Sequence, residues 1–407
     1  MFKYKLVLAI SLFFCIMSAC LVMYEVFYRG FISTVDLAVY RRAGYDIVHS
    51  VPLYSSNFGE KLNVKLGYVY PPISAIIFIP FGFLSMTYTK WIWSILSIFE
   101  LFVVVKISFH EVLKSYKKFQ IPFLFFFTGL FLWINPMYSD LIYGQIDLLI
   151  MTLILIDLVY FVDHKRPKWL KEGILTGLAA ALKLVPLIFI LYFLLVSDYK
   201  KLKNSIISFS VFTLAGFLIM PNDSKIYWFH YLEYTGGHDN AWYYLNQSAD
   251  GILRRILASY WFELWVPLVA LIFIFGIRKA YVANKNNNEF LAVILIGLTG
   301  IIISPISWVH ELVWIIPAIG YILNTGKTKQ QVGAAVTYFI FTLFNLPYIG
   351  DNLINHYHMK ALGYFVENEF GISLIVILVL LTFSKRAPKR NISTQVLASE
   401  TINEAHH

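Results

Sequence analysis

The chain has 407 residues, of which 58% are hydrophobic, 18% are aromatic and only 14% are charged. Soluble domains carry about 25% charged residues, so the composition excludes an ordinary soluble protein and favours an integral membrane protein. The net charge of +9 does not indicate nucleic-acid binding, because the basic residues lie in short loops between apolar runs. Cys15 and Cys20 lie in the first apolar run and provide no disulfide framework.

Long apolar runs recur along the chain and predict a single all-α membrane domain over residues 1–383. With Lys3 and Lys5 inside, the basic loops predict about twelve transmembrane helices and both termini in the cytoplasm. The first run, at 6–28, is long for a signal-peptide core, which favours a retained span. The other runs lie at about 88–109, 121–138, 142–163, 167–183, 185–200, 204–220, 261–277, 289–303, 311–324, 331–347 and 370–383. The polar tail, 384–407, is expected to be a disordered cytoplasmic tail.

Two outer loops are expected, at about 29–70 and 221–250, and residues 36–50 have the spacing of an interfacial helix. The threading requires residues 71–86, which are short and rich in proline, to enter and leave by the outer face as a re-entrant element. A full crossing there is the alternative, and it moves several basic loops outside. The threading also requires residues 167–200 to form a hairpin that turns near Lys183–Pro186, and Pro186 favours a break there.

This topology places the unusual polar groups of the chain at the outer face. A protein that serves only as a membrane anchor does not need such groups there. They are Asp36, Tyr70-Pro71-Pro72, Gly144-Gln145, Lys183, Asn246-Gln247-Ser248 and the stretch from Ser304 to His310. The clustering favours an enzyme or a transporter that works at the outer surface. The plasma or inner membrane is the expected location.

The sequence is compatible with two alternative roles for Asp36 and with two for Lys183. A carboxylate at the membrane surface is poorly solvated, which suits Asp36 to general-base catalysis, but it also fits an N-cap of the helix that follows. An intramembrane lysine marks a functional site by default, so Lys183 is a candidate partner of a lipid-linked phosphate. Its alternative role is to reach the interface with its charged end while its stem stays in lipid.

His310 and Arg254 are the other candidate phosphate partners. A histidine donates to a phosphate or relays a proton near neutral pH, although His310 also fits an aromatic belt beside Trp308. Arg254 breaks the positive-inside pattern, which indicates an anionic ligand or a lipid headgroup. Glu100 lies within the run at 88–109, where it fits either a proton path or a bond to a neighbouring helix. No metal-ligand cluster, Walker sequence or dinucleotide fingerprint is visible.

Together the motifs resemble glycosyltransferase family 87, polyprenyl-phosphate-sugar-dependent enzymes of the GT-C superfamily. The resemblance covers about residues 30–315. The motifs in this order are more specific for the family than any single motif. The motifs are Asp36-Leu37-Ala38-Val39-Tyr40, Leu53-Tyr54, Tyr70-Pro71-Pro72, Gly144-Gln145-Ile146-Asp147, Lys183-Leu184-Val185-Pro186, Asn246-Gln247-Ser248 and Ser304-Pro305-Ile306-Ser307-Trp308.

The resemblance implies a GT-C-type bundle that transfers a sugar, by default mannose, from a polyprenyl-phosphate donor to a glycolipid or glycan acceptor. It implies inversion, no metal and no cofactor, with Asp36 as the general base and His310 at the donor phosphate. The substrate pocket is expected to contain Tyr40, Tyr70, Gln145, Asn246, Gln247, Ser248, Ser304 and Trp308. Val309 and Glu311 depart from the family pattern, which often has a polar residue before this histidine and a second histidine after it.

Two other function classes remain open from the sequence. A multi-pass transporter or flippase needs polar residues along a path through the membrane and often has an internal repeat, and neither is evident. An O-antigen ligase or polymerase also handles polyprenyl-linked glycans and has large outer loops. The ordered motifs favour the transferase, whereas the sugar and the acceptor are not identified by the sequence.

Overall fold

The computed structural model describes residues 2–28, 34–54, 66–162, 164–231, 241–257, 259–326 and 329–382. Within these ranges the protein is helical, and its β-structure is limited to an isolated antiparallel bridge between Asn246 and Trp308. The expected tail, 384–407, lies outside the described residues. So do residues 29–33 and 55–65 of the first outer loop and residues 232–240 of the second.

The helices of the first half are α1 (Phe2–Tyr28), α2 (Val35–Val48), α3 (Pro72–Ala75), η3 (Ile76–Phe78), α4 (Ile79–Gly82), α5 (Met86–Ser108), α6 (His110–Ser115), η4 (Lys117–Phe119), α7 (Gln120–Phe131), α8 (Asn135–Tyr143), α9 (Asp147–Leu158), η5 (Tyr160–Val162), α10 (Ile174–Leu182) and α11 (Leu187–Leu195). Those of the second half are α12 (Tyr199–Ile219), α13 (Pro221–Ile226), η6 (Tyr227–Tyr231), α15 (Ala249–Leu257), α16 (Trp261–Lys285), α17 (Glu289–Ile303), η8 (Val309–Trp314), α18 (Ile315–Thr325), α19 (Lys329–Thr342), α20 (Leu346–Asn355), α21 (Lys360–Glu367) and α22 (Glu369–Leu381).

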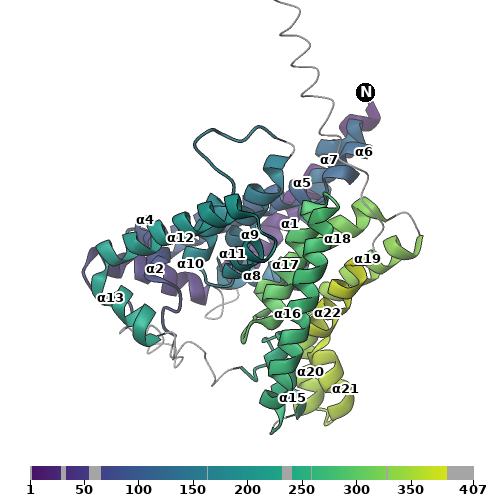
Figure 1. Cartoon of the computed structure of the whole chain (residues 1–407). Coiled ribbons are helices and arrows are strands. Elements are labelled where there is room, and N and C mark those ends of the chain that lie inside the picture. Colours follow the sequence, from purple (N-terminus) through teal and green to yellow (C-terminus); the bar gives the residue numbers. More distant parts are fainter. Residues whose placement is uncertain are drawn as a thin grey trace, which may run out of the picture.

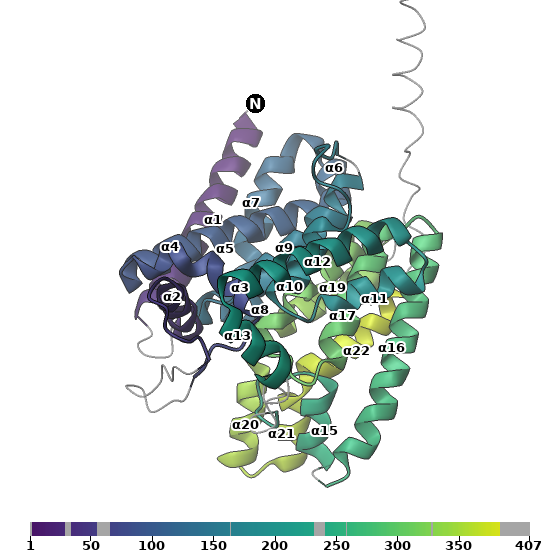
Figure 2. The same ribbon diagram turned by 60° about the vertical axis from the view of Figure 1, so that its left-hand side comes forward.

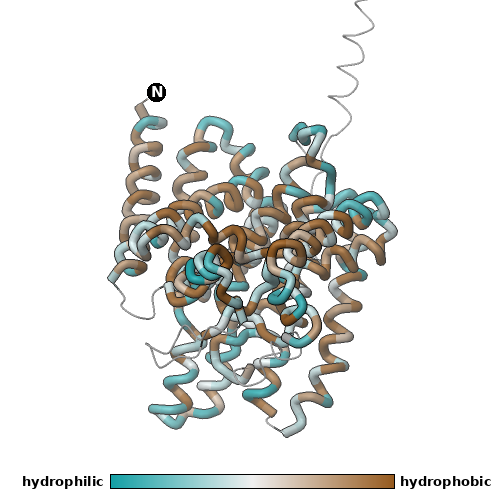
Figure 3. The backbone as a smooth tube through the Cα atoms, turned by 90° about the vertical axis from the view of Figure 1, so that its left-hand side faces the viewer, coloured by the Kyte–Doolittle hydropathy of each residue, from teal (hydrophilic) through white to brown (hydrophobic). Residues whose placement is uncertain are grey.

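The helices are those of a polytopic membrane protein, which confirms the predicted class. In the described part of the chain, α1, α5, α12 and α16 are long and apolar enough to cross a membrane, and the number rises to 7 if each of three bent helix pairs is one span. Hydrophobic residues dominate these helices, while hydrophilic residues gather at their ends and connections (Figure 3). The expected number of about twelve spans is therefore not reached by length and composition alone.

Several predicted apolar runs are interrupted, and one of these breaks builds the site. Instead of continuous helices over 121–138 and 142–163, α7 and α8 meet at 73°, and α9 begins only at Asp147. Helix α8 ends at Gly144, which has a φ of 72°. A Cβ added there would lie 2.5 Å from the Cβ of Leu37 in α2, so glycine allows both the backbone turn and the close approach of α2. Residues 144–146 thus become a short link at the start of α9.

The predicted break near Pro186 is confirmed. Helix α10 ends at Leu182, Lys183 adopts an extended conformation (φ −147°, ψ 135°), and α11 begins at Leu187 after Pro186. The extended backbone takes Lys183 out of the helix, which lets its side chain reach residues on other elements.

The helix expected near residues 36–50 is present as α2, and it packs against η3 and α4, while its place at the membrane interface stays a prediction. These two short helices belong to the 71–86 segment, whose re-entrant course stays a prediction. Helices α15, α20 and α21 gather at the end of the molecule opposite the N-terminus (Figures 1 and 2). Helices α8 and α9 lie between these two ends, and both contact η8.

Candidate active site

Asp36 lies in the first turn of α2, where its carboxylate is only partly exposed. The N-cap position belongs to Thr34, so the alternative role of Asp36 as the cap of this helix does not hold. The Thr34 N–H donates to the Ile142 carbonyl oxygen at 2.5 Å, which ties the start of α2 to α8. Burial raises the pKa of the Asp36 carboxyl from 3.8 to about 6, and a hydrogen bond from Gln145 opposes this shift.

Gln145 is the centre of a buried hydrogen-bond network around Asp36. Its Nε2 donates to Asp36 Oδ2 at 2.7 Å, while its Oε1 accepts from the hydroxyls of Tyr40 at 2.7 Å and Tyr70 at 3.2 Å. The indole N–H of Trp93 donates to the Gln145 carbonyl oxygen at 3.2 Å. Because the tyrosine hydroxyls donate to the amide oxygen, the NH₂ group must face the carboxylate. The structure thus brings together three residues that the sequence predicted for the pocket, beside the predicted base.

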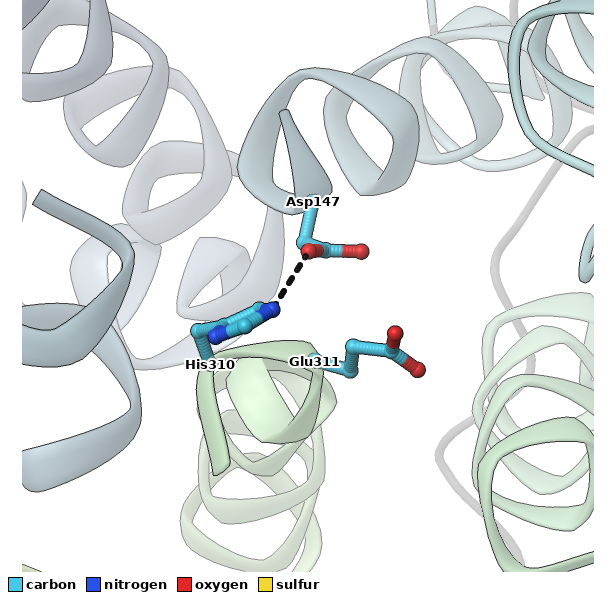
Figure 4. Close-up of side chains that lie close together, drawn as sticks. All are labelled: Asp147, His310 and Glu311. Carbon is cyan, nitrogen blue, oxygen red and sulfur yellow. Dashed lines mark ion pairs between the residues drawn. The ribbon is translucent and has the colours of Figure 1, made fainter. Parts of the chain in front are cut away.

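A buried charged cluster lies next to this network. Lys183 Nζ is 2.6 Å from Asp147 Oδ1 and 2.9 Å from Glu311 Oε1, and the three side chains are at most 9% exposed. Asp147 projects from α9 over η8, with one carboxylate oxygen towards His310 and the other on the side of Glu311 (Figure 4). His310 Nε2 lies 3.7 Å from Asp147 Oδ2. Lys183 Nζ also lies 5.3 Å from the centre of the Tyr70 ring, so Tyr70 contacts both the cluster and the Asp36 network.

Donor atoms of Asp147, His310 and Glu311 lie within 4.8 Å of one another, and nitrogen and carboxylate oxygen are ligands that divalent cations accept. The ammonium of Lys183 already bridges the two carboxylates, so a metal ion would have to compete with it for both. The predicted independence of metal stays a prediction.

A small cavity of about 20 Å³ lies beside the cluster, with Asp147, Lys183 and Glu311 in its wall. The rest of the lining is largely hydrophobic and includes Ile150, Ile154, Val185, Ile188, Phe189 and Trp314. Charged groups beside apolar side chains suit the junction between the polar head and the hydrocarbon chain of an amphiphile.

The Asn246-Gln247-Ser248 triplet is completely buried and bonds to the main chain. Asn246 Oδ1 accepts from the Ser307 N–H at 2.9 Å, and Ser248 Oγ donates to the Pro305 carbonyl oxygen at 3.0 Å. Gln247 Nε2 donates to the Glu367 carbonyl oxygen at 2.9 Å, and its Oε1 accepts from the Gly371 N–H at 3.0 Å. The bonds of Asn246 and Ser248 hold the stretch that precedes His310, and the side-chain bonds of Gln247 connect the triplet to α21 and α22.

Ser304 and Trp308 belong to that stretch. Ser304 Oγ donates to the Ile306 carbonyl oxygen at 2.7 Å, and Trp308 forms the bridge with Asn246. The observed bonds of the predicted pocket residues from Asn246 onwards therefore position η8, and their contact with a substrate stays a prediction. This positioning matters because the place of the His310 side chain depends on the backbone of η8 that carries it.

Arg254 is not brought to the charged cluster by its observed partners. It lies on α15, where Arg254 Nε is 2.7 Å from Asp250 Oδ2 and the guanidinium carbon is 3.4 Å from the centre of the Trp261 ring. Neither partner belongs to the cluster, and α15 lies at the far end with α20 and α21 (Figure 1).

Asp147 and Glu311 were not predicted as site residues, although Asp147 ends a quoted motif and Glu311 follows His310 as a departure from the family pattern. The signal was available, because a lysine in apolar sequence requires an anionic partner, and acidic residues in other apolar runs are the candidates. Sequence alone does not say which acid pairs with which lysine. That pairing depends on the two helix breaks at Gly144 and Lys183.

The sequence profile of glycosyltransferase family 87 matches residues 68–305. The chain is 30% identical over 319 residues to the polyprenol-phosphate-mannose-dependent α-(1-2)-phosphatidylinositol mannoside mannosyltransferase of Mycobacterium tuberculosis, with 74% of this chain and 73% of the relative covered. It is 30% identical over 306 residues to the protein of the same description from Mycolicibacterium smegmatis, at coverages of 70% and 68%.

A third relative, the polyprenol-phosphate-mannose-dependent α-(1-2)-phosphatidylinositol pentamannoside mannosyltransferase of M. tuberculosis, is 25% identical over 321 residues, with 77% of this chain and 72% of the relative covered. No solved structure matches the chain. The profile covers more than half of the sequence, and the relatives are matched over more than two thirds of their length. The chain is therefore a glycosyltransferase and belongs to glycosyltransferase family 87.

Proposed function

We propose that this protein transfers mannose from a polyprenyl-phosphate-mannose donor to a glycolipid acceptor, with inversion and without a metal, at the extracytoplasmic face. One observation carries the proposal: the Lys183 cluster lies between the Asp36 network and the apolar cavity. A base, a cation and a hydrophobic cavity are thus adjacent, in the order that a lipid-linked sugar needs. The two mycobacterial relatives are polyprenol-phosphate-mannose-dependent, which supports the choice of donor.

Asp36 is the general base of the proposed reaction. An acceptor hydroxyl oxygen attacks the anomeric carbon of the donor sugar, and its proton passes to Asp36. The bond between the anomeric carbon and the phosphate oxygen breaks, and the electron pair leaves with the phosphate. A carboxyl whose pKa is about 6 is mostly ionised at pH 7 yet is a stronger base than a solvated aspartate.

Lys183 is the proposed partner of the phosphate. An ammonium has three donors, and two are used on Asp147 and Glu311, so one remains for a phosphate oxygen. A cation beside the departing phosphate stabilises the charge that develops there in the transition state. The first part of the polyprenyl chain would extend along the apolar side chains that line the cavity. Arg254 stays a prediction from the sequence and has no part in this proposal.

The architecture completes the proposal. We expect a GT-C-type bundle of about twelve membrane helices, with both termini in the cytoplasm and the short or bent helices counted as parts of spans. Residues 1–383 would form this membrane domain, with outer loops at about 29–70 and 221–250 and a cytoplasmic tail at 384–407. Asp36, Gln145, Lys183 and His310 then lie at the extracytoplasmic face.

Purified protein supplied with a panel of polyprenyl-phosphate sugars and a phosphatidylinositol mannoside tests the function. We expect transfer from the mannose donor, or slow hydrolysis of that donor when the acceptor is omitted. Addition of a strong chelator of divalent cations should leave the rate unchanged. Transfer from another sugar only, or from none of the polyprenyl-phosphate donors, would overturn the proposal.

A further inference from the structure

Two buried polar atoms of the charged cluster face each other without a hydrogen bond. In the described part of the chain, neither Asp147 Oδ2 nor His310 Nε2 has a hydrogen-bond partner. Asp147 is 7% exposed and His310 is 6% exposed. The two atoms are 3.7 Å apart, which is too long for a direct hydrogen bond (Figure 4). Buried polar atoms normally have partners, so this pair points to a group that is bound there.

The chemistry of the two atoms limits what that group can be. Asp147 Oδ2 is an acceptor, and His310 Nε2 is a donor in the tautomer that carries its proton there. A phosphate oxygen accepts but does not donate, and the Asp147 carboxylate would repel it. A hydroxyl accepts from His310 and donates to Asp147 at once. A single oxygen about 2.8 Å from each atom spans a separation of 3.7 Å.

We propose that His310 and Asp147 together recognise one hydroxyl of the transferred sugar. This inference rests on the proposed function, because it takes the donor to be a sugar on a lipid phosphate. The other oxygen of Asp147 binds Lys183, the proposed phosphate partner. A hydroxyl on Oδ2 therefore lies within a few ångströms of the phosphate, which places it on the donor sugar. His310 is then a sugar-reading residue, in contrast to the phosphate role that the family resemblance implies.

Donors that lack one hydroxyl test this assignment. The deoxy forms of polyprenyl-phosphate-mannose, each without one of the hydroxyls at carbons 2, 3, 4 and 6, are assayed with wild type and with His310→Phe. In wild type, kcat/KM for one of the four deoxy donors should be about 10- to 150-fold lower than for the other three. This is the range expected for the loss of a hydrogen bond to a charged group. In His310→Phe the loss for that same donor should be smaller than in wild type, because His310 is absent and only Asp147 still contacts the hydroxyl.

Two controls separate this outcome from others. His164→Phe removes an exposed histidine that stacks on Tyr160, so it should retain the wild-type pattern over the four donors. Polyprenyl phosphate without a sugar should bind His310→Phe and wild type equally, which also reports that the variant is folded. If His310→Phe does not bind it, His310→Gln, which keeps a donor, is compared and should retain part of the deoxy penalty.

The inference is overturned if His310→Phe lowers kcat/KM by the same factor for every donor, because a phosphate or purely structural role acts on all sugars equally. A loss of polyprenyl phosphate affinity in His310→Gln as well as in His310→Phe also overturns it in favour of the phosphate role. Failure of the proposed function has a different signature, since wild type then does not use the parent mannose donor.

Discussion

Replacing Lys183 by methionine removes the ammonium that Asp147 and Glu311 share while it keeps most of the side-chain volume. The two carboxylates are at most 9% exposed, so solvent does not replace the lost cation. Removal of one partner from a buried ion pair typically costs about 3–5 kcal/mol, because the remaining charge is left uncompensated. Two carboxylates lose their partner here, so we expect Lys183→Met to lower the free energy of unfolding by an amount in the upper part of that range.

Glu311→Gln in the same chain should recover part of this loss, because only one of the two carboxylates then remains charged. Lys200→Met is the matched control, since Lys200 pairs with Glu172 at 3.2 Å but is 74% exposed, and exposed pairs are worth about 0–1 kcal/mol. The assay is equilibrium unfolding in detergent, with helix content as the signal. A stability of Lys183→Met equal to that of Lys200→Met, or a further loss in the double variant, would refute the reasoning about the cluster.

Four further results are expected. Transfer should fall as the pH drops through about 6, because the Asp36 base must be ionised, and Gln145→Leu should move this limb to higher pH by removing the bond that lowers the Asp36 pKa. Lys183→Ala should weaken donor binding by roughly 10- to 100-fold, measured as a Kd, and an unchanged Kd would place the phosphate elsewhere. Gln247→Leu should lower the free energy of unfolding by about 1–3 kcal/mol, because it leaves the Gly371 N–H and the Glu367 carbonyl oxygen unpaired. A cysteine at position 36 should react with an impermeant reagent from outside the cell and one at position 200 only from inside, and the reverse pattern would overturn the threading.

The class of the protein followed from composition, but the number of spans did not follow from the length of its apolar runs. The sequence at 121–138 and 142–163 consists of two continuous apolar runs, whereas the structure has the separate helices α7, α8 and α9 there. A hydropathy pattern does not contain the tertiary contacts that favour a helix break. The close approach of Leu37 to Gly144 is such a contact. The break at Pro186 was predictable because proline acts locally.

The site was predicted in part for a similar reason. Asp36, Tyr40, Tyr70 and Gln145 were named from motifs, and the structure brings them into one network. The partners of Lys183 were not named, because its pairs with Asp147 and Glu311 span 36 and 128 residues of sequence. Contacts at that separation depend on how whole helices pack, which no local pattern encodes.

Asp36→Asn tests the central claim most directly. Asparagine keeps the size of the side chain and a hydrogen-bonding oxygen but cannot take the proton of the acceptor hydroxyl, and general-base catalysis typically contributes about 10²–10⁴-fold. With purified protein, polyprenyl-phosphate-mannose and a phosphatidylinositol mannoside, we expect the variant to fold and to bind the donor as wild type does. Its rate of transfer should fall by about that factor. Near-normal transfer by Asp36→Asn at matched expression would contradict the account and move the base elsewhere, to Asp46 or to Glu60, which lies outside the described residues.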